Sequence, residues 1–485
     1  MNAIAPQLAL AVPALGAMAI AALGRWPNVR ETLTLVTAAS LLLVVVSLVP
    51  DVLSGQLPSA ILLTLLPGLP LALRVEPLGM LFALVASSLW IVNSIYSIGY
   101  MRANNEEHQT RFYVCFAIAL ACTMGIAFAG NLLTLFLFYE ALTLSTYPLV
   151  THHGTPEAKR AGRIYLGILL ATSMGPMLLA IVWTWSLAGT LDFTPGGILA
   201  GKVDGNAVGI LLALYMFGIG KAALMPVHRW LPAAMVAPTP VSALLHAVAV
   251  VKAGVFSVVK VIVYVFGIEN IAGLASVAWL PVIAGVTILG ASIVALRSDN
   301  LKRRLAYSTI SQLSYVILAA ALLTPLSLIG AALHIAAHAV SKITLFFAAG
   351  AIYTTAHKTE VSQLDGIGRR MPLTMTAFTI GALSLIGIPP AAGFVSKWYI
   401  LSGAVASGQS VAVAVLIAST LLNAAYFLPI VHRAFFRPPP TGEAAFGEAP
   451  ALMVGALLIT ATLVVALFFY ADVPLELAKR LAATQ

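Results

Sequence analysis

Five lysines and one glutamate lie inside stretches of this 485-residue chain that otherwise have the composition of membrane spans. The glutamate is Glu140, in the run FLFYEALTLSTYPLV, and the lysines are Lys221, Lys252, Lys260, Lys342 and Lys397. A charged side chain near the centre of a bilayer costs roughly 2.5–3.5 kcal/mol even on the gentlest insertion scales. Charged groups repeated on successive spans therefore indicate a chain that uses them to move charge across or along the membrane.

Two histidines share a helical face with one of these lysines. His334, His338 and Lys342 occupy positions i, i+4 and i+8 of LHIAAHAVSKITLFF, a spacing that stacks side chains on one side of a helix. His246 lies six residues before Lys252 in PVSALLHAVAVVKAGVF, so these two lie on loosely related faces. Protons can pass between such groups through intervening water, and the pattern predicts a proton relay.

Glu140 is the only carboxylate deep in a predicted helix, and Lys221 is its expected partner. A nearby carboxylate stabilises a buried ammonium, so separating the two groups would release a proton. The alternative is that Glu140 is a structural partner for a lysine. We interpret Lys260, which is nearer a helix end, as a side chain that extends to the membrane interface.

The same residues favour protons over sodium. Hard cations require several oxygen ligands, and the deep segments contain Glu140 as their single carboxylate. Backbone carbonyls at interrupted helices remain an alternative source of sodium ligands.

The composition requires that these groups be held by membrane helices. The chain is 60% hydrophobic and 9% charged, whereas soluble domains contain about 25% charged residues. Since a spanning helix needs about 20 apolar residues, we predict an all-α polytopic membrane protein with about fourteen helices. The expected helices are 7–23, 32–49, 77–99, 112–129, 132–150, 163–187, 207–224, 240–266, 275–296, 304–323, 326–354, 373–403, 410–435 and 450–470.

Two of the predicted helices, the seventh and the twelfth, contain strong helix breakers at depth. The seventh contains GIGKAALMPVHRWLP around Lys221, and the twelfth contains GIPPAAGFVSKW just before Lys397. Breaks in lipid survive only where protein or a water-filled cavity satisfies the backbone. Because paired broken helices indicate inverted repeats, we predict repeats of helices 4–8 (112–270) and 9–13 (271–437). Helices 1–3 (1–111) precede them and helix 14 (438–485) follows.

The net charge of +9 is dispersed over short loops and is no sign of nucleic-acid binding. With fourteen helices, 17 of the 26 Lys and Arg residues fall in alternate loops, 4 fall on the other side and 5 are the buried lysines. By the positive-inside rule, both termini are expected on the non-cytoplasmic side.

No motif for a cofactor or a metal is recognised in the chain. It has no P-loop, no G-x-G-x-x-G that opens a helix and no C-x-x-C cluster. His152 and His153 are expected to be solvated loop residues rather than metal ligands. We therefore expect no redox or hydrolytic site, and the driving energy must come from an ion gradient or a partner subunit. Whether the protein counts as an enzyme depends on the complex that contains it.

Three runs resemble a known family. They are LMPVHRWLPAAMVAPTPVSALLHAVAVVKAGV (224–255), DNLKRRLAYSTISQLSYV (299–316) and LSLIGIPPAAGFVSKWYIL (383–401). They are similar to the antiporter-like membrane subunits shared by respiratory complex I, Mrp-type multisubunit cation/proton antiporters and membrane-bound hydrogenases. The resemblance implies fourteen helices, two inverted five-helix repeats and broken helices seven and twelve.

The resemblance also implies roles for the candidate residues. Glu140 matches the family's helix-5 glutamate, Lys221 its helix-7 lysine, and Lys252 the helix-8 lysine of some members. The stripe of His334, His338 and Lys342 matches the helix-11 relay, and Lys397 matches the terminal helix-12 lysine. The sequence departs from the family pattern at Tyr139, where tryptophan is common, and at Ser314, where glycine is usual.

Among the family's members, the D-like component of an Mrp-type Na⁺(K⁺)/H⁺ antiporter is the expected match. No long lateral helix is expected after helix 14, and Lys397 replaces the glutamate of the middle complex I subunit. The alternatives are a proton-pumping subunit of complex I or of a membrane hydrogenase, and the membrane subunit of an inorganic-carbon uptake complex. The expected partners are further membrane subunits, antiporter-like ones among them, in the cell inner membrane, with any sodium site in a partner.

Overall fold

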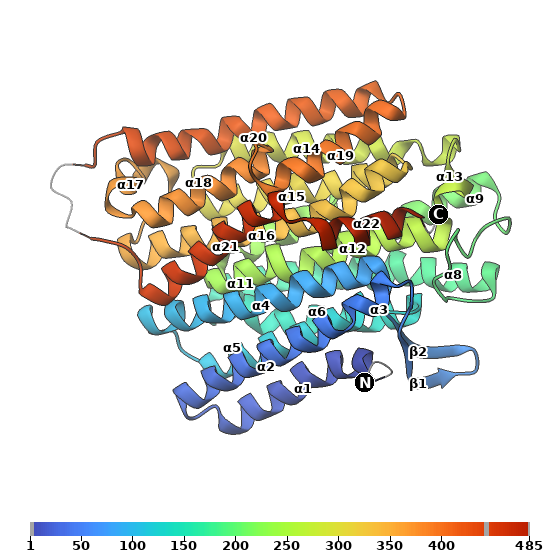
Figure 1. Ribbon diagram of the computed structural model, residues 1–485, viewed down its shortest axis with the longest axis horizontal. Coiled ribbons are helices and arrows are strands. Elements are labelled where there is room, and N and C mark those ends of the chain that lie inside the picture. Colours follow the sequence, from blue (N-terminus) through green and yellow to red (C-terminus); the bar gives the residue numbers. More distant parts are fainter. Residues whose placement is uncertain (1–3, 441–445, 484–485) are drawn as a thin grey trace.

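A computed structural model of the chain describes residues 4–440 and 446–483. Its long helices lie side by side in one bundle, with a small hairpin at one end (Figure 1). In the described residues, eleven helical stretches are long and apolar enough to cross a membrane, and two apolar helices are shorter. The prediction of an all-α polytopic membrane protein is confirmed.

The first hundred residues form the outer edge of the bundle and one element that we did not expect. Residues 50–76 were predicted as a connection, but they contain an antiparallel hairpin whose strands meet at Pro67 and Gly68, where Gly68 has φ +79°. A Pro-Gly dipeptide between two apolar runs is a turn signal. The elements are α1 (Ala5–Leu23), α2 (Pro27–Ser47), α3 (Val49–Leu53), β1 (Ser59–Leu66), β2 (Leu69–Arg74) and α4 (Pro77–Ala103).

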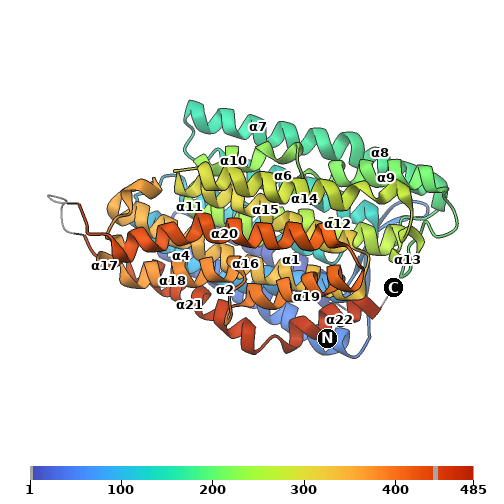
Figure 2. The same cartoon turned by 90° about the horizontal axis from the view of Figure 1, so that it is seen from above.

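The next segment forms one side of the bundle, where α7 lies at the edge (Figure 2). A π-helical turn over Ser173–Met177 joins two of its helices into one stretch. The helices are α5 (Gln109–Ala127), α6 (Leu132–Val150), α7 (Pro156–Thr172), α8 (Leu178–Ala188) and α9 (Gly205–Gly218).

Two π-helical turns extend α12 at both ends. Leu244–Val248 joins it to α11, and Ile262–Phe266 follows it. The helices of this part are α10 (Trp230–Ala233), α11 (Thr239–Ala243), α12 (Val250–Val261), α13 (Ile268–Ile271), α14 (Trp279–Arg297), α15 (Leu301–Ala321) and α16 (Pro325–Ala356).

The last part completes the bundle, and its final two helices lie on the side opposite α7 (Figure 2). Its helices are α17 (Ile367–Arg370), α18 (Pro372–Ile386), α19 (Ala392–Ala406), α20 (Ser410–Phe436), α21 (Ala451–Phe469) and α22 (Asp472–Ala483). The last of these, α22, lies beyond the expected end of helix 14. It packs Leu477, Ala478 and Leu481 inward.

Both expected helix breaks are present. In the seventh span α9 ends at Gly218, a 3₁₀ turn holds Lys221, and Ala223 has φ +56°. In the twelfth span α18 ends at Ile386, Gly387 has φ +96°, and α19 begins at Ala392 before Lys397. The first break puts Lys221 on a short 3₁₀ turn, and the second lets the carbonyls of Leu385 and Ile386 accept hydrogen bonds from the side chain of Lys397.

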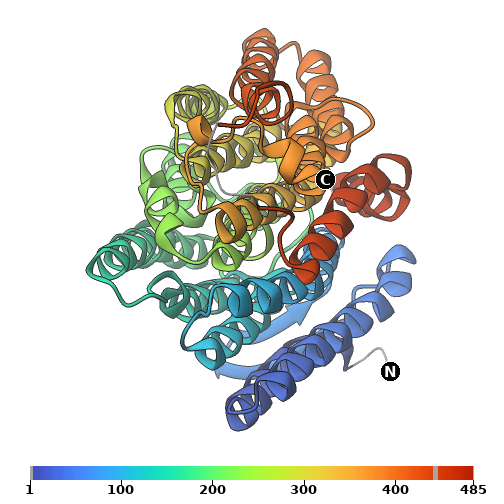
Figure 3. The same cartoon turned by 90° about the vertical axis from the view of Figure 1, so that its left-hand side faces the viewer.

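Two helical stretches form the centre of the bundle, as the end-on view shows (Figure 3). All of Thr239–Phe266, and residues 327–352 of Pro325–Ala356, are buried by the other helices. A Cβ on Gly254 of α12 would overlap the backbone of Lys221 and Ala222, so this glycine lets the broken segment pack directly on α12. Lys252, Lys260 and Lys342 therefore lie on the two buried stretches, and Lys221 lies against one of them.

Candidate functional site

Lys221 is fully buried and is held by α6. Its Nζ donates to the carbonyl oxygen of Tyr139 at 2.7 Å and to the hydroxyl of Thr143 at 2.6 Å. The ammonium also lies 3.2 Å from the centre of the Tyr139 ring, and the Tyr139 hydroxyl accepts the backbone N–H of Lys221 at 3.0 Å. Tyr139 thus binds the lysine at both the side chain and the backbone. Thr143, one turn further along α6, was not identified from the sequence.

Glu140 lies next to this cradle without bonding to Lys221. Both carboxylate oxygens are buried and have no hydrogen-bond partner among the described residues. The charge of Glu140 nevertheless lies within electrostatic range of Lys221. Leu137 and Leu144, one turn to either side, are 37% and 57% exposed. Glu140 therefore lies on the side of α6 that carries these exposed leucines, with its oxygens covered by the protein, while Tyr139 and Thr143 face inward.

The stripe on α16 joins α12 through a direct hydrogen bond. Lys252 Nζ and His338 Nδ1 are bonded to each other, and both side chains are 1% exposed. His338 Nε2 has no partner among the described residues. An amine and an imidazole in contact can share one proton, because each is a base that can donate once it is protonated.

His334 continues the stripe toward the second break. Its Nδ1 lies 2.9 Å from the hydroxyl of Ser396 and its Nε2 3.1 Å from the amide oxygen of Gln312. The rings of His334 and His338 stack with centroids 6.1 Å apart. Since Ser396 precedes Lys397, the stripe connects Lys252 on α12 to the lysine of the second break.

A second branch leads from Lys342 to Lys397 through polar residues of α15 and α20. Lys342 Nζ donates to Ser308 Oγ at 2.9 Å, and this oxygen also accepts the hydroxyl of Tyr426 at 3.1 Å. The Tyr426 hydroxyl bonds to Asn423, whose amide donates to the carbonyl of Leu385 at 3.3 Å. Lys397 Nζ donates to the same carbonyl at 2.6 Å.

Three residues of this branch were not predicted from the sequence: Ser308, Asn423 and Tyr426. A signal existed for α15, where Ser308, Gln312 and Tyr315 recur at helical spacing in an apolar helix. Asn423 and Tyr426 gave no comparable signal.

Lys397 differs from the other lysines because it lies at the side of the bundle. A cavity of about 300 Å³ opens beside it and is lined mostly by apolar residues of α19 and α20. Trp398 and Leu421 on its walls are 58% and 67% exposed. The relay thus reaches the outer face of the bundle at Lys397.

His246 is also buried and is bonded at one ring nitrogen only. Its Nδ1 lies 3.0 Å from the hydroxyl of Thr309, and its ring packs on Phe346 with centroids 4.7 Å apart. Nε2 has no partner among the described residues.

The interpretation of Lys260 as an interfacial side chain is wrong. Lys260 is fully buried, and its Nζ lies 3.1 Å from the carboxylate of Glu76 and donates to the carbonyl of Ala129 at 2.6 Å. Glu76 immediately precedes α4, 184 positions away in the chain. A carboxylate from a distant helix end compensates the buried ammonium, and no local sequence pattern predicted it.

Breaking this ion pair should destabilise the protein. Glu76→Gln leaves Lys260 without a counter-charge, and removal of one partner of a buried pair costs about 3–5 kcal/mol. We expect a lower thermal unfolding midpoint of the purified complex, and Glu76→Gln combined with Lys260→Met should recover most of the loss. Equal midpoints for Glu76→Gln and wild type would contradict a stabilising role.

The arrangement supplies protonatable groups and few metal ligands. In the part of the chain that the structure describes, no three His, Cys, Asp or Glu side chains are grouped to hold a metal ion. The lysines and histidines on α12, α16 and α19 instead lie in series between the two breaks.

Comparison with known proteins places this geometry in a family. Residues 129–423 match the model of the NADH:quinone oxidoreductase/Mrp antiporter transmembrane family. NADH-quinone oxidoreductase subunit N of Desulforudis audaxviator is 35% identical over 408 residues, which are 80% of this chain and 79% of that protein. The A/B component of a probable K(+)/H(+) antiporter of Rhizobium meliloti is 31% identical over 388 residues, 77% of this chain but only 37% of the relative.

A solved structure has the same fold. A chain in the Mrp complex from Dietzia sp. DQ12-45-1b superimposes with a TM-score of 0.87 at 23% identity, covering 99% of this chain and 97% of that one. The likeness extends over both broken spans and the central stretches that carry the lysines. The chain belongs to the NADH:quinone oxidoreductase/Mrp antiporter family and is an antiporter-like membrane subunit.

Proposed function

We propose that this chain moves protons along the bundle through Lys221, Lys252, His338, His334, Lys342 and Lys397, with Glu140 and His246 as further exchanging groups. The observation that carries the proposal is the contact between Lys252 and His338, continued by His334 to Ser396 beside Lys397. Each of these groups can bind and release a proton. Protonation at one end and deprotonation at the other move one charge without moving a side chain far.

The ends of the relay support a role within a larger assembly. Glu140 lies on the side of α6 that carries exposed leucines, and Lys397 borders a lateral cavity. A buried charge at an interface is stabilised when a partner supplies a counter-charge. We propose that neighbouring membrane subunits cover both ends and extend the relay beyond this chain.

For the assembly, we propose an Mrp-type cation/proton antiporter in which this chain is the D-like component. The fold of the Mrp complex chain supports it over nearly the whole length. The termini would lie on the non-cytoplasmic side of the cell inner membrane, as the distribution of basic residues indicates.

A second candidate is the proton-pumping subunit of a complex I-like oxidoreductase. The likeness to subunit N, which covers 79% of that protein, favours it. Both candidates use the same relay and differ in what drives it. The subunits that co-purify with the chain decide between them, because only the oxidoreductase contains quinone-reducing and Fe–S subunits.

The ion selectivity of the chain tests the proposal. We expect Glu140→Gln and Lys397→Ala to stop proton movement in proteoliposomes that contain the intact complex, as followed with a pH-sensitive dye. If the complex exchanges ²²Na⁺, both substitutions should lower the rate of ²²Na⁺ uptake together with the rate of proton movement. The affinity of the complex for sodium should stay unchanged, since the deep segments of this chain hold too few oxygen ligands for sodium. Density for a dehydrated sodium ion between α5 and α20 would contradict the proposal.

A further inference from the structure

A cavity of about 220 Å³ lies at the end of the bundle that holds the β-hairpin, where α1 begins and α22 ends (Figure 1). It is enclosed by the end of α3, the end of β2, the first turn of α4 and the end of α22. Pro77 opens one of the long spans and Tyr264 lies in the last turn of another, so the cavity is at the depth where the spans end. In a bilayer, lipid head groups lie at this depth.

Two arginines line this cavity and use few of their hydrogen-bond donors. Arg74 Nη1 donates to the carbonyl of Phe193 at 3.3 Å, and Arg480 Nε donates to Glu476 at 3.0 Å. Each guanidinium carries five N–H donors, and neither makes another side-chain hydrogen bond to a described residue. Gly55 leaves room for Arg480, because a Cβ there would lie 3.9 Å from Nη1. Both guanidinium groups therefore have donors left for a ligand.

The charges around the cavity favour an anionic ligand. Glu76 is the carboxylate among the lining residues, and Lys260, 3.1 Å away, compensates its charge. Glu476 is 45% exposed, and an ion pair at such a surface position contributes little. Arg74 has no ion-pair partner in the described part of the chain. Three cations thus stand against two carboxylates, and an anion would offset the difference.

The basic residues of this end are concentrated at the cavity. The sequence places four Lys and Arg residues on this side of the membrane, which are Arg74, Lys202, Lys479 and Arg480. Two of the four line the cavity, and Lys479 adjoins Arg480 on α22. Because basic residues favour the other side of a membrane, their grouping here indicates a shared ligand.

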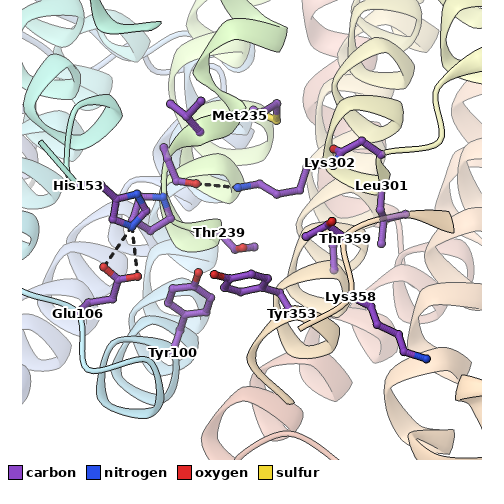
Figure 4. Close-up of a pocket in the computed structure, with 15 residues that line it drawn as sticks. Tyr100, Glu106, His153, Met235, Thr239, Leu301, Lys302, Tyr353, Lys358 and Thr359 are labelled. Carbon is purple, nitrogen blue, oxygen red and sulfur yellow. Dashed lines mark hydrogen bonds and ion pairs between the residues drawn. The ribbon is translucent and has the colours of Figure 1, made fainter. Parts of the chain in front are cut away.

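The cavity at the opposite end of the bundle also contains cations, but its side chains are occupied (Figure 4). Lys302 Nζ donates to the carbonyl of Ala237 at 2.6 Å. Glu106 faces His153 with the carboxylate 3.3 Å from Nε2, and its charge would repel an anion. The features of an anion site are therefore found at Arg74 and Arg480 rather than in this cavity.

The walls of the cavity point to an amphipathic ligand. Val52, Leu57 and Ala483 line it beside the two arginines. At about 220 Å³ it is smaller than the roughly 300–1,000 Å³ of sites that enclose a drug-sized molecule, so the head of a lipid would enter and its chains would stay outside. Leu43 and Val46, at the end of α2 that leads into α3, are 72% and 47% exposed and offer an apolar surface for them.

We propose that this cavity binds the phosphate of an anionic phospholipid, with Arg74 and Arg480 as its ligands and the acyl chains along the end of α2. Guanidinium groups bind phosphate oxygens through paired N–H donors. The bound lipid would join α22 to the base of the hairpin. This site goes beyond the proposed function and does not depend on the proton relay.

Photo-crosslinking in the intact, delipidated complex tests the site. The probe is a phosphatidylglycerol that carries a diazirine in one acyl chain, and the readout is the amount of probe on residues 49–57, which are the same in every variant. We expect Arg74→Gln/Arg480→Gln to lower this labelling at least about tenfold, or about 1.4 kcal/mol in binding. Lys202→Gln is the matched control, since it removes one positive charge on the same side outside the cavity, and it should label like wild type.

Competition identifies what the arginines recognise. Unlabelled phosphatidylglycerol should displace the probe, whereas phosphatidylcholine and inorganic phosphate at the same concentration should not. Equal displacement by phosphatidylcholine would mean an apolar groove without selectivity for an anionic lipid, and displacement by inorganic phosphate would mean a site for the free ion. Crosslinks from residues 49–57 to a partner subunit in place of lipid would mean a protein interface. Each of these three results would overturn the proposal.

Thermal unfolding of the complex provides a second measurement. Added phosphatidylglycerol should raise the unfolding midpoint of wild type and of Lys202→Gln but not that of Arg74→Gln/Arg480→Gln. If the double variant fails to assemble, Arg480→Gln alone, at a side chain that is 34% exposed, should still lower the labelling about threefold, because one of two charged hydrogen-bonding groups is lost. Labelling at the wild-type level in an assembled variant that lacks either arginine would overturn the role of that arginine.

Discussion

Lys221→Met should abolish proton-coupled transport while the complex still assembles. The substitution removes the protonatable amine held by Tyr139 and Thr143, and it leaves a chain of similar volume that a buried site tolerates. Loss of a group that transfers a proton costs about 10²–10⁴-fold in rate. The measurement is the initial rate of proton movement in proteoliposomes, normalised to the amount of assembled complex.

An exposed lysine provides the control for this substitution. Lys202 lies in the loop before α9, and its Nζ donates to the carbonyl of Ala188. Lys202→Met makes the same chemical change outside the relay and should transport at the wild-type rate. Should assembled Lys221→Met also transport at the wild-type rate, Lys221 is not part of the path.

Interrupting the relay at the contact between α12 and α16 should have an effect of similar size. His338→Gln keeps a polar side chain at the position but cannot bind a proton, so Lys252 loses its exchange partner. We expect proton movement to fall about a hundredfold. Lys252→Met should give the same loss, and the double variant should be no slower than either single variant.

This non-additivity distinguishes a shared step from two separate ones, because variants in one step do not add. His357→Asn, at the exposed end of the same helix, serves as the control for a histidine substitution on α16. Multiplicative losses in the Lys252→Met/His338→Gln double variant would mean that the two residues act in different steps.

The sequence predicted the charged groups of the site because each one stands out in an apolar span. Lys221 and Lys397 were further marked by glycine and proline, whose backbone effects are local and can be read without tertiary contacts. The stripe of His334, His338 and Lys342 followed from helical spacing alone. These features depend on neighbours in sequence, and the structure has each in the expected element.

The residues that were missed depend on contacts between distant segments. Ser308, Asn423 and Tyr426 connect Lys342 to Lys397, yet serine, asparagine and tyrosine in a membrane helix often bond to their own helix or face water. Glu76 reaches Lys260 from 184 positions away. Which residues of α6 hold Lys221 depends on the rotation of that helix, and the rotation turns Glu140 away from direct contact.

The β-hairpin was missed for a different reason. Its two strands are apolar, but each is too short to span a membrane. In a chain this hydrophobic, the segment was therefore assigned as a connection between two spans. The Pro67–Gly68 turn was the available signal.

The most direct test of a proton relay through this chain is a structure of the intact complex at a resolution that shows ordered water. The account predicts water that links the Lys252–His338 pair to Lys342 and Lys397 and reaches Nε2 of His338, which has no partner among the described residues. A stretch of packed apolar side chains between these groups, with no water on either side of it in any state of the working complex, would contradict the account.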